Sequence, residues 1–166
     1  KSINLLKNRL EKKPNIILDL ACGTGLFGEE LTKIYNNSQI YGSDISQKSL
    51  EIAKEKGIYK NLTRINFERK KYYRTKFDLV SMLGAMTYCN NFNKLFSNIK
   101  YYLLKNGHFI FSHRLDLWEK QKFDNILQKH KNNLDIKYIS KPQSYLPLNK
   151  DFKNKIKIRL VLMQKT

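Results

Sequence analysis

Cysteine, proline and glycine are all scarce in this 166-residue sequence, which contains two, three and seven of them. The two cysteines, Cys22 and Cys89, cannot form a disulfide framework, so a small secreted fold held together by disulfides is excluded. The hydrophobic fraction of 41% is ordinary for a globular protein and argues against a disordered chain. We therefore expect a single domain over residues 1–166 with reduced cysteines, located in the cytoplasm.

Long apolar runs are also missing. Stretches such as Ile16–Leu20 and Phe109–Phe111 are too short to cross a bilayer. The first 13 residues alternate charged residues with leucine and do not have the pattern of a secretory signal. We expect no association with a membrane.

Acidic residues are few, 14 against 32 basic ones, and the formal net charge is +18. Only six of the basic residues are arginine, and the lysines are scattered along the chain apart from a cluster at residues 69–74. An A/T-rich genome would produce this excess of lysine without selection for function. A surface that binds RNA is the alternative, although such surfaces usually add arginine forks and aromatic stacking.

Hydrophobic spacing predicts alternating helices and strands. The expected helices are Ser2–Lys12, Leu26–Tyr35, Gln47–Lys56, Phe92–Leu104 and Leu117–Lys131. The expected strands are Asn15–Leu20, Gln39–Gly42, Leu62–Phe67, Phe77–Leu83 and His108–Ser112, followed by the pair Ile136–Ser140 and Ile156–Met163. This order predicts an α/β fold: a Rossmann-like, doubly wound and mostly parallel sheet with a closing antiparallel strand at the C-terminal end.

A glycine-rich turn follows the first predicted strand, in the segment Asp19-Leu-Ala-Cys-Gly-Thr-Gly-Leu-Phe-Gly28. Gly23, Gly25 and Gly28 have the G-x-G-x-x-G spacing, and Asp44 lies 19 residues after Gly25. Such glycines let a ligand approach the backbone, and an acid at the end of the second strand can accept hydrogen bonds from ribose hydroxyls. The pattern predicts a site for an adenosine-containing cofactor.

Asp19 discriminates between the two cofactor classes that use this turn. A nicotinamide dinucleotide would place its pyrophosphate over the turn, where a neighbouring carboxylate would repel it. S-adenosylmethionine instead carries an ammonium and a sulfonium, which a carboxylate attracts. S-adenosylmethionine is therefore the expected cofactor, a nicotinamide-dependent oxidoreductase is disfavoured, and Asp19 could also serve only to bond the backbone of the turn.

The same residues resemble the class I methyltransferases. Asp19 to Gly25 is similar to their first motif, Gly42 to Ser46 to their second, and Phe77 to Val80 and Gly107 to Phe111 to their fourth and fifth strands. Leu26–Leu31 and Ala53–Tyr59 resemble more particularly a subgroup of small methyltransferases that includes the Williams–Beuren-region protein.

This resemblance implies roles for individual residues. Asp44 would bind the ribose hydroxyls, Ile45 would pack on the adenine, and Asn66 stands where the family often has an aspartate that accepts from the adenine amino group. Phe67 and Leu83 would line the cofactor, although they and Ile45 could equally be ordinary core. The methionine end would be held by Asp19, Ala21, Gly23 and Gly25.

The methyl acceptor is not identified by the sequence. Residues after the fourth and fifth strands would surround it, which makes Tyr88, His113 and Arg114 candidates. His113 could act as a base, or could simply end its strand. Pro142–Pro147 could shape a substrate pocket or be only a rigid loop.

A small-molecule acceptor is the preferred interpretation. An RNA or protein acceptor, or a cofactor-binding protein without transfer activity, remains open. The Asn/Asp-Pro-Pro-aromatic motif of amino-group DNA methyltransferases is missing after the fourth strand. The spacing of His and Cys predicts no metal site. The oligomeric state is not predicted.

Overall fold

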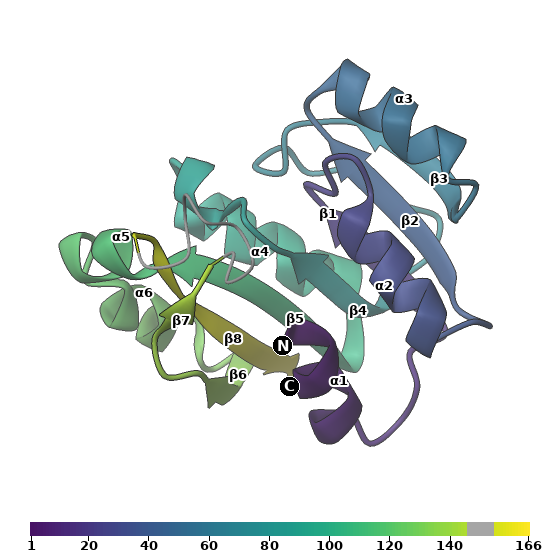
Figure 1. Ribbon diagram of the computed structural model, residues 1–166. Coiled ribbons are helices and arrows are strands. Elements are labelled where there is room, and N and C mark those ends of the chain that lie inside the picture. Colours follow the sequence, from purple (N-terminus) through teal and green to yellow (C-terminus); the bar gives the residue numbers. More distant parts are fainter. Residues whose placement is uncertain (146–154) are drawn as a thin grey trace.

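The computed structural model describes residues 1–145 and 155–166, and its described strands form one eight-stranded sheet. The strand order is β3-β2-β1-β4-β5-β8-β6, with β7 paired to β8 (Figure 1). Strands β1 to β5 are parallel to their neighbours among them, while β8 runs antiparallel to β5, β6 and β7. Their bounds are β1 Ile16–Leu20, β2 Gln39–Asp44, β3 Tyr59–Arg64, β4 Phe77–Met82, β5 Leu103–Arg114, β6 Leu134–Ile139, β7 Gln143–Ser144 and β8 Lys157–Lys165.

Helices cover both faces of this sheet, because alternate residues of its central strands are apolar on both sides. One core contains Ile17 of β1 and Leu162 of β8 together with side chains of α1 and α2. The other contains Leu18 and Val80 together with side chains of α4, α5 and α6. The helices are α1 Ser2–Arg9, α2 Leu26–Ile34, α3 Gln47–Glu55, η1 Met86–Tyr88, α4 Phe92–Tyr102, α5 Leu115–Lys120 and α6 Phe123–His130.

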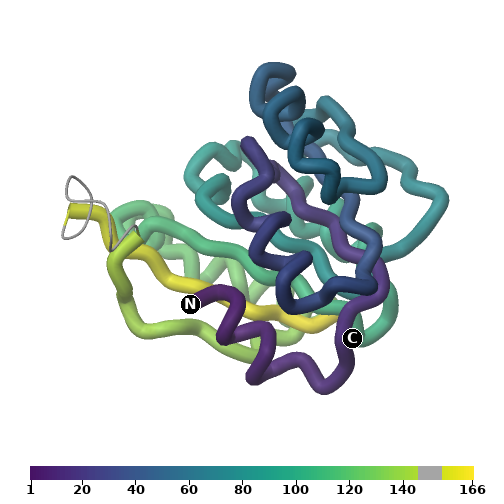
Figure 2. The backbone as a smooth tube through the Cα atoms, turned by 45° about the vertical axis from the view of Figure 1, so that its right-hand side comes forward, coloured from purple at the N-terminus to yellow at the C-terminus, as the bar shows by residue number. Residues whose placement is uncertain are grey.

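The chain changes direction across the sheet between β1 and β4. From β1 it proceeds outward through β2 to β3, and then returns to build β4 and β5 on the other side of β1. Figure 2 shows the result: the blue part of the chain, which contains β2 and β3, lies at one end of the molecule, and the green and yellow parts lie at the other. Such a switch point leaves a crevice at the carboxyl ends of the strands, where α/β proteins bind ligands.

The predicted fold class is confirmed, with local differences. The third strand is Tyr59–Arg64 rather than Leu62–Phe67, because the chain leaves the sheet in a turn in which the Asn66 side chain accepts from the N–H of Glu68. The predicted helix Leu117–Lys131 is two helices, since Lys122 adopts a left-handed conformation with φ +48°. The short strand β7 was not predicted, and Pro147 lies outside the described residues.

Within residues 1–145 and 155–166, none of the helices combines the length and the apolar character needed to cross a membrane.

Candidate functional site

The glycine-rich turn between β1 and α2 is built from residues in the left-handed region of backbone conformation. Ala21 has φ +56°, Gly23 +55° and Gly25 +85°. Gly25 is the N-cap of α2, so the free N–H groups of that helix face the turn. A Cβ added to Gly23 would meet nothing within 4 Å. The backbone at Gly23 therefore borders open space, as a ligand that contacts the main chain requires.

Asp44, at the end of β2, holds this turn in place. Its Oδ2 accepts a hydrogen bond from the N–H of Gly23 at 2.8 Å, and its Oδ1 accepts from the N–H of Ser46, also at 2.8 Å. Ser46 in turn caps α3 by accepting from the N–H of Ser49. Each carboxylate oxygen keeps a second lone pair, and the half-buried side chain can still accept from a ligand hydroxyl.

Asp19 is buried beneath the turn, with 2% of its surface exposed. Its Oδ2 accepts from the Tyr59 hydroxyl at 2.8 Å, and its Oδ1 accepts from the Ser81 hydroxyl at 2.7 Å. Burial raises the pKa of Asp19 to about 6, although the hydrogen bonds from Ser81 and Tyr59 oppose this rise. Asp19 therefore bonds two side chains rather than the backbone of the turn, and places a costly negative charge directly beneath it.

Tyr59 reaches Asp19 from β3 by lying across β2, which is possible because of three glycines. A Cβ on Gly42 of β2 would come within 2.9 Å of the Tyr59 ring, one on Gly25 within 3.0 Å, and one on Gly28 within 2.3 Å of the hydroxyl. Tyr59 was not among the site residues predicted from the sequence. Gly42 was the available signal, because a glycine inside a strand often marks the close approach of another group.

Two exposed apolar side chains flank the turn. Leu26, the first residue of α2, is 68% exposed, and Ile45, which follows β2, is 62% exposed. Side chains that are both apolar and this exposed are free to pack against the flat ring of a ligand. The structure thus places Ile45 outside the core, beside Asp44.

The remaining predicted cofactor residues differ in their surroundings. Asn66 lies near Asp44, since the neighbouring Ile65 N–H donates to the Asp44 carbonyl, but its Oδ1 already accepts from Glu68. Phe67 is half-buried against the core beneath α4. Leu83 follows β4 and is also half-buried. Their contact with a cofactor stays a prediction.

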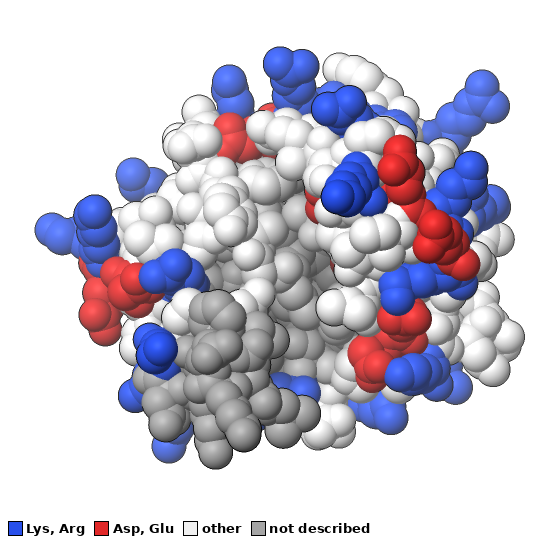
Figure 3. Space-filling model, turned by 45° about the horizontal axis from the view of Figure 1, so that its top comes forward, with Lys and Arg blue, Asp and Glu red and all other residues white. Residues whose placement is uncertain are grey.

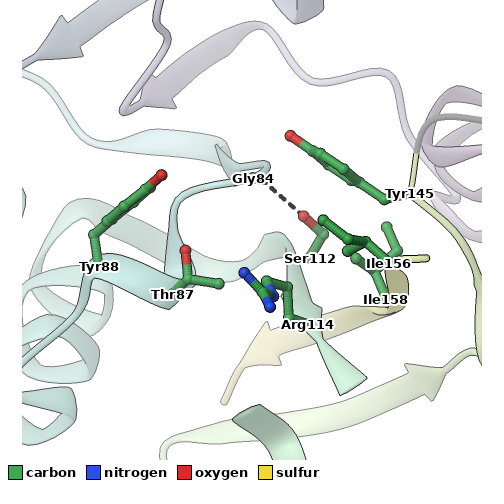
Figure 4. A pocket seen from close by; sticks show the side chains of 8 residues that line it. All are labelled: Gly84, Thr87, Tyr88, Ser112, Arg114, Tyr145, Ile156 and Ile158. Carbon is green, nitrogen blue, oxygen red and sulfur yellow. Dashed lines mark hydrogen bonds between the residues drawn. The ribbon is translucent and has the colours of Figure 1, made fainter. Parts of the chain in front are cut away.

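A cavity of about 210 Å³ opens beyond β4 and β5 (Figure 4). At its base the Ser112 hydroxyl accepts from the N–H of Gly84 at 2.8 Å, and Gly84 has φ +77°. The predicted acceptor candidates Tyr88 and Arg114 both line this cavity, while Tyr145 was predicted only as part of a loop. The described lining residues are Gly84, Thr87, Tyr88, Ser112, Arg114, Tyr145, Ile156 and Ile158.

His113 is not among those lining residues, and its candidacy as a base in the acceptor pocket is not supported. It is 1% exposed, and its ring packs against Phe123 and Trp118 on the opposite face of β5. Its Nε2 lies 2.9 Å from Oε1 of Gln121, and burial lowers the pKa of the imidazole. His113 points away from the cavity because successive side chains of a strand alternate between its faces: Ser112 and Arg114 share one face of β5, and His113 lies on the other.

On the face shown in Figure 3, most of the visible lysine and arginine side chains lie near the margin, and the described residues near the middle are mostly uncharged. Both cysteines are buried, and burial raises the pKa of each thiol to about 12. In the described part of the chain, no three His, Cys, Asp or Glu side chains come together as a metal site would require.

A left-handed glycine turn after β1, an acid at the end of β2 and a crevice at the switch point define an α/β domain that binds a small cofactor. The family model described as "Methyltransferase domain" matches residues 11–137, and the chain belongs to this family. The predicted membership in the methyltransferases is thus confirmed, while the finer Williams–Beuren-like subgroup stays a prediction.

Named relatives and solved structures agree with this assignment. The chain is 33% identical over 98 residues to malonyl-[acyl-carrier protein] O-methyltransferase 2 of Ilyobacter polytropus, which covers 58% of this chain and 38% of the relative. It is 29% identical over 106 residues to the malonyl-[acyl-carrier protein] O-methyltransferase of Legionella pneumophila, covering 62% and 37%. The chain therefore spans less than two fifths of the length of these relatives.

A crystal structure of a putative S-adenosylmethionine-dependent methyltransferase from Listeria monocytogenes has the same fold. Its TM-score is 0.76 at 18% identity, with 98% of this chain and 97% of that chain covered. This likeness confirms the architecture of the sheet and its helices.

Proposed function

We propose that the protein binds S-adenosylmethionine at the glycine-rich turn and transfers its methyl group to a small molecule in the adjoining cavity. The observation that carries this proposal is the buried Asp19 carboxylate beneath an open turn. A cationic ligand gains from that charge, whereas the pyrophosphate of a nicotinamide cofactor would be repelled by it.

The residues present suit this cofactor. Asp44 would accept from the ribose hydroxyls, Ile45 and Leu26 would pack on the adenine, and the turn from Ala21 to Gly25 would hold the methionine end above Asp19. Asn66 would face the adenine amino group with the lone pair that Glu68 leaves free. When bound, S-adenosylmethionine supplies an activated methyl group on its sulfonium.

What the chain contributes to transfer is placement. The turn lies at the end of β1, and the cavity lies at the ends of β4 and β5, directly across the switch point. An acceptor held there would meet the methyl group without covalent help from the protein, and orientation of that kind accounts for large rate accelerations.

The size of the cavity favours a small acceptor, or the end of a larger one. The relatives are named for methylation of malonyl groups on acyl-carrier protein, which supports an acceptor of comparable size.

An RNA acceptor is less well supported. Lys70 and Lys76, whose Nζ atoms lie 3.8 and 3.3 Å from the Tyr101 ring centroid, gather where the chain enters β4, at the opposite end of that strand from the cavity.

Calorimetric titration with S-adenosylmethionine and, separately, with NAD tests the proposal. We expect saturable binding of S-adenosylmethionine and none of NAD. Asp44→Ala should weaken that binding at least tenfold, because it removes charged acceptors from two hydroxyls and also loosens Gly23. Asp135→Ala, an exposed acid paired with Lys137, serves as the matched control and should bind as the native chain does. Binding of NAD, or no binding of S-adenosylmethionine by the native chain, would overturn the proposal.

A further inference from the structure

The cavity beyond β4 and β5 has two unlike walls. Ile156, Ile158 and the Tyr145 ring form an apolar side (Figure 4). Thr87 and Arg114 lie on the other side, the Ser112 hydroxyl lies next to Ile156, and Arg114 carries the charge among the described lining residues (Figure 4). A cavity with one apolar wall and one cationic group on the other selects for amphiphilic ligands.

The Arg114 guanidinium, at the end of β5, is oriented by a two-point pairing with Asp116. Its Nε donates to Oδ1 of Asp116 at 3.1 Å, and its Nη2 donates to Oδ2 at 2.6 Å. This two-point pairing occupies one edge of the guanidinium and leaves the Nη1 donors for a ligand. Pre-orientation of this kind reduces the entropy lost when an oxyanion binds.

Asp116 does not cancel the attraction for an anion. Its side chain is 59% exposed, so solvent screens its charge, and the pair with Arg114 is itself on the surface side. Asp116 is also absent from the described cavity lining, whereas Arg114 is part of it. The strongly positive net charge of the chain adds a general attraction for anionic ligands.

We propose that the methyl acceptor carries an oxyanionic group, a carboxylate or a phosphate, that Arg114 binds, with its apolar part against Ile156 and Ile158. This rests on the proposed function, since it assigns the cavity to the acceptor. Arg114 anchors this group through its Nη1 donors, which engage only some of the lone pairs of the oxyanion. Arg114 is thus a specificity-determining residue.

Three small probes test this on the full chain loaded with S-adenosylhomocysteine: phenylacetate, phenyl phosphate and the uncharged phenylacetamide. Dissociation constants are measured by ligand-observed NMR. We expect at least one of the two anions to bind ten times more tightly than the amide, as a charged hydrogen-bonded contact would provide. The anion that binds better distinguishes a carboxylate acceptor from a phosphorylated one.

Arg114→Gln should abolish this tenfold preference and leave the amide bound as before. Arg74→Gln, which removes an exposed arginine before β4, is the matched control and should retain the preference. Equal binding of amide and anions to the native chain, an undiminished preference in Arg114→Gln, or no binding of any probe would each overturn the proposal.

Titration of Arg114→Gln with S-adenosylmethionine separates the two proposals. The variant should bind S-adenosylmethionine with native affinity, because Arg114 lies outside the glycine turn. If the native chain binds S-adenosylmethionine but shows no anion preference, only the acceptor proposal fails; if it does not bind S-adenosylmethionine, the proposed function fails.

Discussion

Asp19→Asn is expected to stabilise the protein at neutral pH and to weaken its binding of S-adenosylmethionine about 100-fold. Both effects follow from one buried charge. The carboxylate is 2% exposed and has a pKa of about 6 in place of 3.8. A rise in pKa of that size means that ionisation of Asp19 lowers the free energy of unfolding by about 3 kcal/mol.

The sign of the pH dependence follows from that pKa. Between about pH 4 and 6 the folded state holds a proton at Asp19 that the unfolded state has lost, so the free energy of unfolding falls as the pH rises. Above pH 6 Asp19 is ionised in the folded state as well, and the whole loss of stability from its buried charge is present. Asparagine never ionises, and the Tyr59 and Ser81 hydroxyls can reorient to bond its amide, so we expect Asp19→Asn to raise the free energy of unfolding at pH 8 by about 1–3 kcal/mol.

Cofactor affinity should show the opposite trend. The native chain should bind S-adenosylmethionine more tightly as the pH rises through about 6, since only the ionised Asp19 attracts the ammonium and sulfonium. Asp19→Asn should lose this pH dependence along with the affinity. Urea unfolding and calorimetric titration at pH 5 and pH 8 measure both effects. A variant that is less stable at pH 8, or that binds with an unchanged pH profile, would contradict this account of Asp19.

Gly28→Ala is expected to lower the free energy of unfolding by about 3 kcal/mol. In an exposed helix the same substitution would stabilise by up to about 1 kcal/mol. Here the new methyl group would lie 2.3 Å from the Tyr59 hydroxyl, which must move and give up its hydrogen bond to Asp19. The steric cost and the lost charged hydrogen bond together exceed the gain in helix propensity.

A double-mutant cycle with Tyr59→Leu isolates this contact. In the Tyr59→Leu background the phenol is gone and the end of the Ile58 side chain, whose Cδ1 lies 3.0 Å from the new methyl group, can shift, so Gly28→Ala should cost less than about 1 kcal/mol in urea unfolding. If Gly28→Ala lowers the free energy of unfolding equally in both backgrounds, the room needed by the Tyr59 hydroxyl is not the reason for glycine at this position.

The local part of the site could be predicted from the sequence, because it depends on neighbours along the chain. The turn from Asp19 to Gly28 contains its own strand end, glycines and helix start, and Asp44 follows at the spacing of one helix and one strand. The parallel order of the strands follows from their alternation with helices.

The remainder depends on contacts that no spacing encodes. Ser81 reaches Asp19 only because β4 pairs with β1 in a register that makes Ser81 the direct partner of Asp19. Tyr59 reaches it across a strand, and Ile158 enters the cavity from a strand added near the end of the chain. His113 could not be placed from the sequence for another reason. Strand alternation puts His113 and Arg114 on opposite faces of β5, but it does not reveal which of these faces holds the cavity.

The order of the strands also determines when each half of the site can form during synthesis. Asp19, Asp44 and Tyr59 all come before β4 in the chain, so β1, β2 and β3 can pair among themselves before β4 is translated. The cavity is different, because β8 is translated after β6 yet lies between β5 and β6. We therefore expect the strands that carry Asp19, Asp44 and Tyr59 to be able to pair first, whereas the cavity can enclose an acceptor only after β8 has inserted into the sheet.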